Sequence, residues 1–183
     1  MERLFFLKKF IDAPQQIGSI TPSSKFLVQK MLGGLDWKYF RYVAELGTGT
    51  GVFTRYIMQH KHSQCKFLGI ERDAEMRQNL QAEYPDAFWD ECAENLCDSL
   101  RMAHFPRLDC VVSGLPFAVI DESARFKIME GVLRAMAPDG IFVAFQYSLQ
   151  MKPLLRRYFG VVSVEFTMLN LPPAFIYFCR RSG

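Results

Sequence analysis

The sequence has no long apolar run, no paired cysteine motif and little excess charge, and each absence excludes a class of protein. No run approaches the ~18 apolar residues of a membrane-spanning helix, and the mean hydropathy is only +0.01. Its five cysteines form no C-x-x-C pair, so we expect reduced thiols in a cytoplasmic protein rather than a secreted disulfide scaffold. Of its three histidines, the pair His60 and His62 lacks nearby acidic or thiol partners at ligand spacing, so no metal site is expected.

The balance of charges is weak. The 22 basic and 19 acidic residues give a net charge of +3. Proteins that bind RNA usually have a more strongly basic surface, whereas a net charge of this size is compatible with binding to an anionic membrane. Charged residues interrupt positions 1–9 too early for a secretory signal, and we expect none. Half of the 183 residues are apolar, which supplies the core of a single domain over residues 1–183.

Residues 1–34 are predicted to form an N-terminal helical segment. A helix over residues 2–12 would place Leu4, Phe6, Leu7, Phe10 and Ile11 on one side, and Lys8 and Lys9 on the other. This helix either contacts an anionic membrane reversibly or packs on the sheet. A second helix is predicted to begin with Thr21 as N-cap and Pro22 at its first position, and to end at residues 33–34.

Strand and helix patterns alternate over residues 41–183. The expected strands cover residues 41–46, 65–71, 87–90, 109–113, 141–147, 161–168 and 175–180. The expected helices cover residues 53–60, 74–84, 122–137 and 149–159. Strands that are apolar throughout and alternate with helices indicate a doubly wound α/β fold. We therefore expect a mostly parallel, seven-stranded sheet that ends in an antiparallel hairpin.

A glycine-rich loop follows the first strand. Gly47, Gly49 and Gly51 allow a sharp turn and a close approach of the backbone, including Thr48, to a ligand. A dinucleotide fingerprint would place its third glycine one position later, and a generic strand-to-helix turn is the structural alternative. The G-x-G-x-G spacing, with Glu45 two residues ahead, is instead the pattern of the S-adenosylmethionine site in class I methyltransferases.

The next two strands carry the residues expected to hold the adenosine. Glu71 ends the second strand, where an acid can accept hydrogen bonds from both ribose hydroxyls, and Arg72 is its neighbour. After the third strand, Cys92 stands where many class I enzymes have an aspartate, so the Ala93 amide or an acid of residues 90–91 would meet the adenine.

The fourth strand ends in the sequence S-G-L-P-F at residues 113–117, which we interpret as the substrate turn. The carbonyl of Ser113, which also borders the cofactor, would orient a nitrogen. Pro116 would stiffen the turn, and Phe117 would present an aromatic face to a methylated cation. Tyr147, at the end of the fifth strand, would help to line the pocket. The same sequence also fits an ordinary exit from a strand.

These motifs resemble those of the small bacterial phospholipid N-methyltransferases, which are similar to the ribosomal RNA adenine dimethyltransferases. The resemblance rests on I-G-S-I-T-P-S-S at 17–24, the cofactor loop at 45–54, the substrate turn, and N-L-P-P-A at 170–174. It implies methyl transfer from S-adenosylmethionine to the amine of phosphatidylethanolamine, with S-adenosylhomocysteine as product. It also implies that Ser19, Ile20 and Ser23 close over the cofactor.

Three other functions stay open. A soluble small-molecule amine could replace the lipid, and a non-catalytic S-adenosylmethionine-binding domain would share the cofactor loop. RNA adenine methylation is disfavoured because the charge is low and Ser113 replaces the usual asparagine. We expect a cytoplasmic enzyme without an obligate protein partner, peripheral to the inner face of the membrane if Phe6, Lys8, Lys9 and Phe10 contact lipid.

Overall fold

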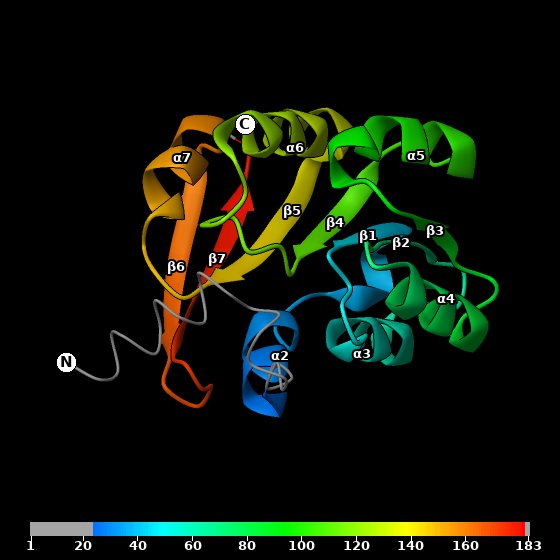
Figure 1. Ribbon diagram of the computed structural model, residues 1–183, viewed down its shortest axis with the longest axis horizontal. Coiled ribbons are helices and arrows are strands. Elements are labelled where there is room, and N and C mark those ends of the chain that lie inside the picture. The colour runs from blue at the N-terminus through cyan, green and yellow to red at the C-terminus, as the bar shows by residue number, and fades with distance from the viewer. Residues whose placement is uncertain (1–23, 182–183) are drawn as a thin grey trace.

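A seven-stranded sheet organises residues 24–181, which are the part of the chain that the computed structural model describes (Figure 1). The strand order is β3-β2-β1-β4-β5-β7-β6. Its strands are β1 (Tyr42–Leu46), β2 (Lys66–Ile70), β3 (Phe88–Asp90), β4 (Leu108–Ser113), β5 (Met136–Gln146), β6 (Val161–Thr167) and β7 (Ala174–Arg180). Strands β1 to β5 are parallel, and β7 lies antiparallel between β5 and β6. The predicted fold class and the C-terminal hairpin are confirmed.

Helices cover both faces of the sheet. They are α2 (Lys25–Leu32), α3 (Val52–His60), α4 (Ala74–Glu83), α5 (Leu96–Ala103), α6 (Glu122–Ala135) and α7 (Met151–Tyr158). Helices α5, α6 and α7 lie on one face, and α2, α3 and α4 lie on the other (Figure 1). Short 3-10 turns at Trp37–Tyr39 and Ala93–Asn95 precede β1 and α5.

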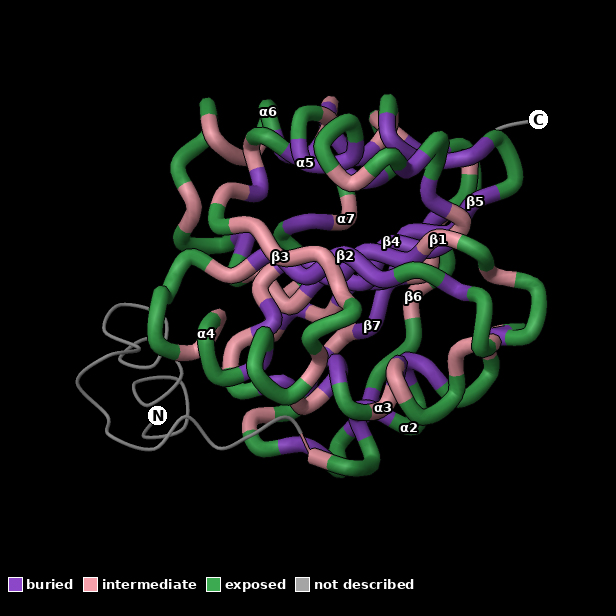
Figure 2. Tube along the Cα trace, turned by 90° about the vertical axis from the view of Figure 1, so that its right-hand side faces the viewer, coloured by how far each residue is buried: buried purple, intermediate pink, exposed green. Residues whose placement is uncertain are grey.

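The central strands are buried on both sides, as their continuous apolar sequences predicted (Figure 2). Successive residues alternate between two core clusters. Ala44 and Val111 pack on the face of α5, α6 and α7, whereas Val43 and Val112 pack on the face of α2 and α3. The rigid centre of the sheet therefore fixes the loops that leave the carboxyl ends of β1 and β4.

Three local expectations differ from the structure. Helix α2 begins at Lys25 with Ser24 as its cap, not at Thr21, because the Ser24 hydroxyl accepts from the Leu27 amide at 3.1 Å. Helix α6 ends at Ala135 and β5 begins at once, so residues 138–140 lie inside the strand, where the pairing of β5 with β4 shifts register. Helix α5 was not predicted: Leu96, Leu100 and Ala103 do have helical spacing, but the helix is only eight residues long, which is short for a periodic signal.

Candidate active site

The candidate site lies where β1 and β4 run side by side, at their carboxyl ends. The chain passes from β1 to β2 on one side, whereas β4 begins the other half of the sheet. Such a reversal of strand order leaves a crevice between the loops, and ligands of doubly wound folds bind there. The topology thus brings the cofactor loop and the substrate turn to one place.

All three loop glycines adopt left-handed backbone conformations, with φ angles of 74° at Gly47, 53° at Gly49 and 82° at Gly51. A side chain at Gly47 would lie 2.9 Å from Leu115, and one at Gly51 would lie 2.4 Å from Leu80. A side chain at Gly49 would meet no atom within 4 Å. Gly49 therefore marks the point where the backbone borders open space that a ligand could fill.

Glu71 holds this loop from the next strand. One carboxylate oxygen accepts from the Gly49 amide at 2.7 Å, and the other accepts from the Asp73 amide at 2.9 Å. These bonds fix the carboxylate beside the loop, and each oxygen keeps a lone pair for a ribose hydroxyl. The adjacent Arg72 is exposed, and its carbonyl accepts from the Arg77 guanidinium at 3.4 Å.

Glu45 is fully buried in β1, below the loop. One of its carboxylate oxygens accepts from the Thr54 hydroxyl at 2.7 Å, whereas the other oxygen has no partner in the described residues. Burial raises the pKa of Glu45 to about 8; the Thr54 hydrogen bond opposes this rise and the charge of Glu71 adds to it. The Thr48 hydroxyl is also buried without a partner among residues 24–181.

The segment after β3 is arranged around Asp90. Its carboxylate accepts from the Glu91 amide at 2.7 Å and from the Ser99 hydroxyl at 2.6 Å. Cys92 donates its thiol to Glu94 at 3.2 Å, and Ala93 is buried at the start of a 3-10 turn. Asp90 thus anchors α5 to the end of β3. Because its carboxylate already accepts these two hydrogen bonds, the Ala93 amide is the predicted adenine contact that requires less rearrangement.

The substrate turn is held directly against the cofactor loop. The Gly114 amide donates to the Leu46 carbonyl at 2.8 Å, and a side chain at Gly114 would lie 2.6 Å from the Gly47 carbonyl oxygen. Ser113 is buried, and its hydroxyl accepts from the Leu115 amide at 3.3 Å. Only glycine at position 114 allows the two loops to approach this closely.

Gln146, at the end of β5, is a site residue that the sequence reasoning missed. Its side chain is buried, and its amide group donates to the Leu115 carbonyl at 2.9 Å. A lone amide at the end of the otherwise apolar residues 141–145 was the available signal. Gln146 therefore fixes the middle of the substrate turn from a neighbouring strand.

The structure separates Phe117 from Tyr147. Phe117 is 1% exposed and belongs to the core on the face of α5, α6 and α7, whereas Pro116 beside it is exposed. Tyr147 packs on the opposite face, edge to face with Phe145. Burial raises the pKa of Tyr147, and a hydrogen bond to Asn170 opposes the rise. The roles of these side chains toward a substrate stay predictions.

Seven predicted contact residues lie outside the described part of the chain. They are Phe6, Lys8, Lys9, Phe10, Ser19, Ile20 and Ser23. Within residues 24–181, no group of metal-ligating side chains is found and no helix is long and apolar enough to cross a membrane.

The fold and this loop geometry define a Rossmann-like methyltransferase. A family model described as a methyltransferase domain matches residues 43–140. The ornithine lipid N-methyltransferase of Singulisphaera acidiphila is 31% identical over 180 residues, which cover 96% of this chain and 94% of the relative. The chain belongs to the class I S-adenosylmethionine-dependent methyltransferases.

Solved structures share the fold. A precorrin-6y C5,15-methyltransferase from Geobacter metallireducens superimposes with a TM-score of 0.67 at 15% identity, covering 87% of this chain and 89% of that one. A 16S rRNA N2 methyltransferase from T. thermophilus, in complex with S-adenosylmethionine and guanosine, gives a TM-score of 0.64 at 21% identity. That match covers 92% of this chain and 45% of the other.

The residues present fit S-adenosylmethionine. The open space at Gly49 and the carboxylate of Glu71 suit a nucleoside with two ribose hydroxyls. The unpartnered oxygen of Glu45 suits the cationic amino group of the methionine portion, which would lower the pKa of this carboxyl again. The enzyme therefore uses S-adenosylmethionine as its methyl donor, with these residues as the expected contacts.

Gly49→Ala should separate ligand binding from folding. The added methyl group meets no protein atom but projects where the ligand approaches, so S-adenosylhomocysteine should bind at least about tenfold more weakly. Alanine is strained in the left-handed conformation of this position, so the free energy of unfolding should fall by about 1–2 kcal/mol. Calorimetry measures the affinity for S-adenosylhomocysteine, and urea unfolding measures the stability. Gly34→Ala is the control, because a side chain at Gly34 would also meet open space. Undiminished affinity would contradict the assignment of Gly49.

Glu45→Gln should change how stability depends on pH. The native pKa of about 8 exceeds the unfolded value of about 4.3, so the folded state keeps a proton that the unfolded state loses. Glu45 therefore lowers the free energy of unfolding progressively as pH rises from ~4.5 to ~8, by a few kcal/mol in total. Glutamine cannot titrate, so the variant should gain stability over the natural chain across this window. Urea unfolding at several pH values measures the difference, and parallel curves would refute the raised pKa.

Proposed function

We propose that the protein methylates the amine of a membrane lipid, with phosphatidylethanolamine-type phospholipids as the expected acceptor. The observation that carries the proposal is the likeness to an ornithine lipid N-methyltransferase over 96% of the chain. A match of this extent includes the substrate turn as well as the cofactor loop. Phosphatidylethanolamine and ornithine lipid both present a head-group amine. The likeness therefore supports a lipid amine as the methyl acceptor, in addition to S-adenosylmethionine as the methyl donor.

The substrate turn is suited to an amine acceptor. S-adenosylmethionine supplies a methyl group on a positively charged sulfur, which requires a nucleophile with an unshared electron pair. An ammonium of the ethanolamine type has a pKa of about 10 and is mostly protonated at neutral pH. No side chain in residues 113–117 can titrate. We infer that the turn contributes alignment and exclusion of water, and that the proton passes to solvent.

Rigidity is the property that alignment needs. The turn is tied to β1 through Gly114, to β5 through Gln146, and to its own backbone through the Phe117 amide, which donates to the Leu115 carbonyl at 2.9 Å. These bonds leave the turn little freedom to shift when a substrate arrives. We expect the enzyme to act peripherally, at the cytoplasmic face of the membrane, because its substrate resides there.

Methylation assays with the full-length protein and deuterated S-adenosylmethionine test the proposal. Mixed micelles would carry phosphatidylethanolamine, ornithine lipid or, as a control without a methylatable amine, phosphatidylcholine. Soluble glycerophosphoethanolamine and RNA complete the set. Mass spectrometry should find label in the amine lipids, at a rate at least about tenfold above the soluble head group. Equal rates on the head group would favour a small-molecule enzyme, and label confined to RNA would overturn the proposal.

Gln146→Met should impair turnover without impairing cofactor binding. Methionine fills a similar volume but cannot donate to the Leu115 carbonyl, so the substrate turn loses its support from β5. We expect kcat on the lipid to fall about tenfold, while the affinity for S-adenosylhomocysteine stays within about twofold. Gln81→Met, at an exposed position of α4, is the matched control. An unchanged kcat in the Gln146 variant would refute this positioning role.

A further inference from the structure

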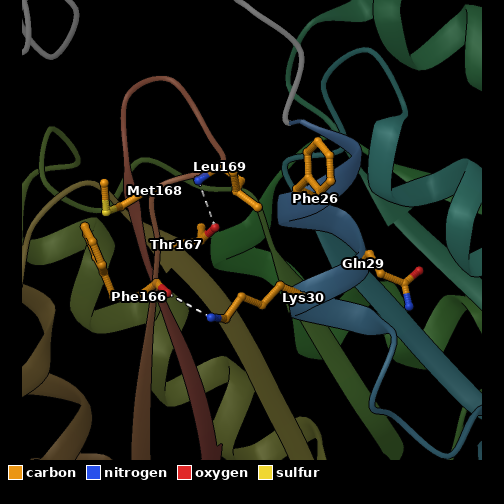
Figure 3. Close-up of a pocket in the computed structure, with 7 residues that line it drawn as sticks. All are labelled: Phe26, Gln29, Lys30, Phe166, Thr167, Met168 and Leu169. Atoms are coloured by element: carbon orange, nitrogen blue, oxygen red, sulfur yellow. Dashed lines mark hydrogen bonds between the residues drawn. The ribbon is translucent and has the colours of Figure 1, made fainter.

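An open groove of about 500 Å³ lies between α2 and the end of β6 (Figure 3). Its lining residues are Phe26, Gln29 and Lys30 from α2, and Phe166, Thr167, Met168 and Leu169 from the end of β6 and the loop that follows. Most of these side chains are apolar, yet they face outward. The loop of residues 168–173 then leads into β7.

This loop is inverted relative to an ordinary surface loop, because its polar groups point inward and its apolar groups point outward. Asn170 is buried, and its side chain donates to the Pro172 carbonyl at 2.8 Å. By contrast, Met168 is 76% exposed, Leu169 62% and Leu171 78%. Exposed apolar side chains gathered in one place mark a surface that contacts an apolar partner.

Hydrogen bonds to α2 hold the loop in this form. The Ser24 amide donates to the Asn170 side chain at 3.0 Å, and the Ser24 hydroxyl donates to the Leu169 carbonyl at 2.7 Å. Lys30 donates to the Phe166 carbonyl at 2.8 Å. The apolar side chains are therefore fixed outward by a polar framework rather than free to fold back on the protein.

The loop lies at the edge of the sheet that also carries the active site. It precedes β7, whose residue Phe175 pairs with Gln146 at the carboxyl end of β5. Gln146 in turn holds the substrate turn through the Leu115 carbonyl. A partner bound to the loop would therefore lie beside the point where the acceptor amine must enter.

The charges beside the groove favour an anionic partner. Lys25 and Lys30 project from α2, and both are exposed. Lys30 lies 3.6 Å from Glu165, and both side chains remain substantially exposed. Basic side chains next to an exposed apolar cluster are the combination that binds the interface of an anionic bilayer.

We propose that Phe26, Phe166, Met168, Leu169 and Leu171, hereafter the apolar rim, insert into the interfacial region of an anionic lipid bilayer. This inference rests on the proposed lipid substrate, and it specifies how that substrate is reached. The rim enters the boundary between head groups and acyl chains, while Lys25 contacts anionic head groups. The substrate turn then lies close to the membrane plane, so a lipid amine can reach it without leaving the bilayer completely.

Vesicle flotation of the full chain tests the rim. The vesicles contain phosphatidylcholine with or without about one-third phosphatidylglycerol. The rim variant combines Met168→Ser, Leu169→Ser and Leu171→Ser. The control variant combines Met102→Ser, Phe126→Ser and Val161→Ser, at positions between 53% and 67% exposed and outside the rim. We expect partitioning to anionic vesicles to fall about tenfold for the rim variant only. The affinity of either variant for S-adenosylhomocysteine should stay unchanged.

A second probe identifies what covers the rim. Because Trp37 and Trp89 also emit, the emission of Leu171→Trp is taken as the difference from the spectrum of the natural chain. This difference emission should have a maximum typical of an exposed indole and should shift to the blue when anionic vesicles are added. Emission that is already blue-shifted without vesicles would overturn the inference, because the rim would then be covered by another segment of this chain or by a second copy. Light scattering separates these two cases. Flotation of the rim variant equal to that of the natural chain would also overturn it.

The outcomes distinguish this inference from the proposed function. If lipid amines are methylated in micelles but flotation does not depend on the rim, the membrane surface is wrong and the function stands. If flotation depends on the rim but no lipid amine is methylated, the surface stands and the proposed acceptor is wrong.

Discussion

The close contact between Gly114 and the β1 loop is the constraint on which the rest of the site depends. The Gly114 amide donates to the Leu46 carbonyl at 2.8 Å, and the Gly47 carbonyl oxygen lies where a side chain at position 114 would be. Methyl transfer requires donor and acceptor to meet in line over a short distance. Two loops that touch through glycine, on strands buried from both faces, would provide a fixed meeting point for the proposed donor and acceptor that flexible loops could not.

The buried acid below this contact links the cofactor site to stability. Glu45 lies where solvent cannot reach it, with one oxygen satisfied by Thr54 and the other without a partner in the described residues. An unsatisfied buried oxygen destabilises the ligand-free fold. A binding site that keeps such a group gains affinity for a ligand that supplies the missing partner. The same arrangement explains why the pKa of Glu45 is raised to about 8.

At the surface, the contact between α2 and the β6–β7 loop also combines polar and apolar groups in an unusual arrangement. The Ser24 amide donates to the Asn170 side chain, whose own amide group donates to the Pro172 carbonyl, so this polar framework is satisfied internally while the neighbouring apolar side chains remain exposed. The loop starts β7, and β7 pairs with the strand that carries Gln146. The candidate active site and the apolar rim are therefore parts of one rigid sheet edge, which would give the proposed lipid-directed enzyme a defined orientation.

The fold class and the cofactor loop could be predicted from the sequence, because both depend on local patterns. Apolar strand segments alternate with helices, and the glycines at positions 47, 49 and 51 form the sharp turn that their spacing indicated, with a positive φ angle at each. The partners of Gln146 and Asn170 could not be predicted in this way, nor could the placement of Phe117 and Tyr147 on opposite faces of the sheet. The bond from Ser24 to Asn170 spans 146 positions. Local propensity carries no information about contacts at that separation, which arise from strand order and packing.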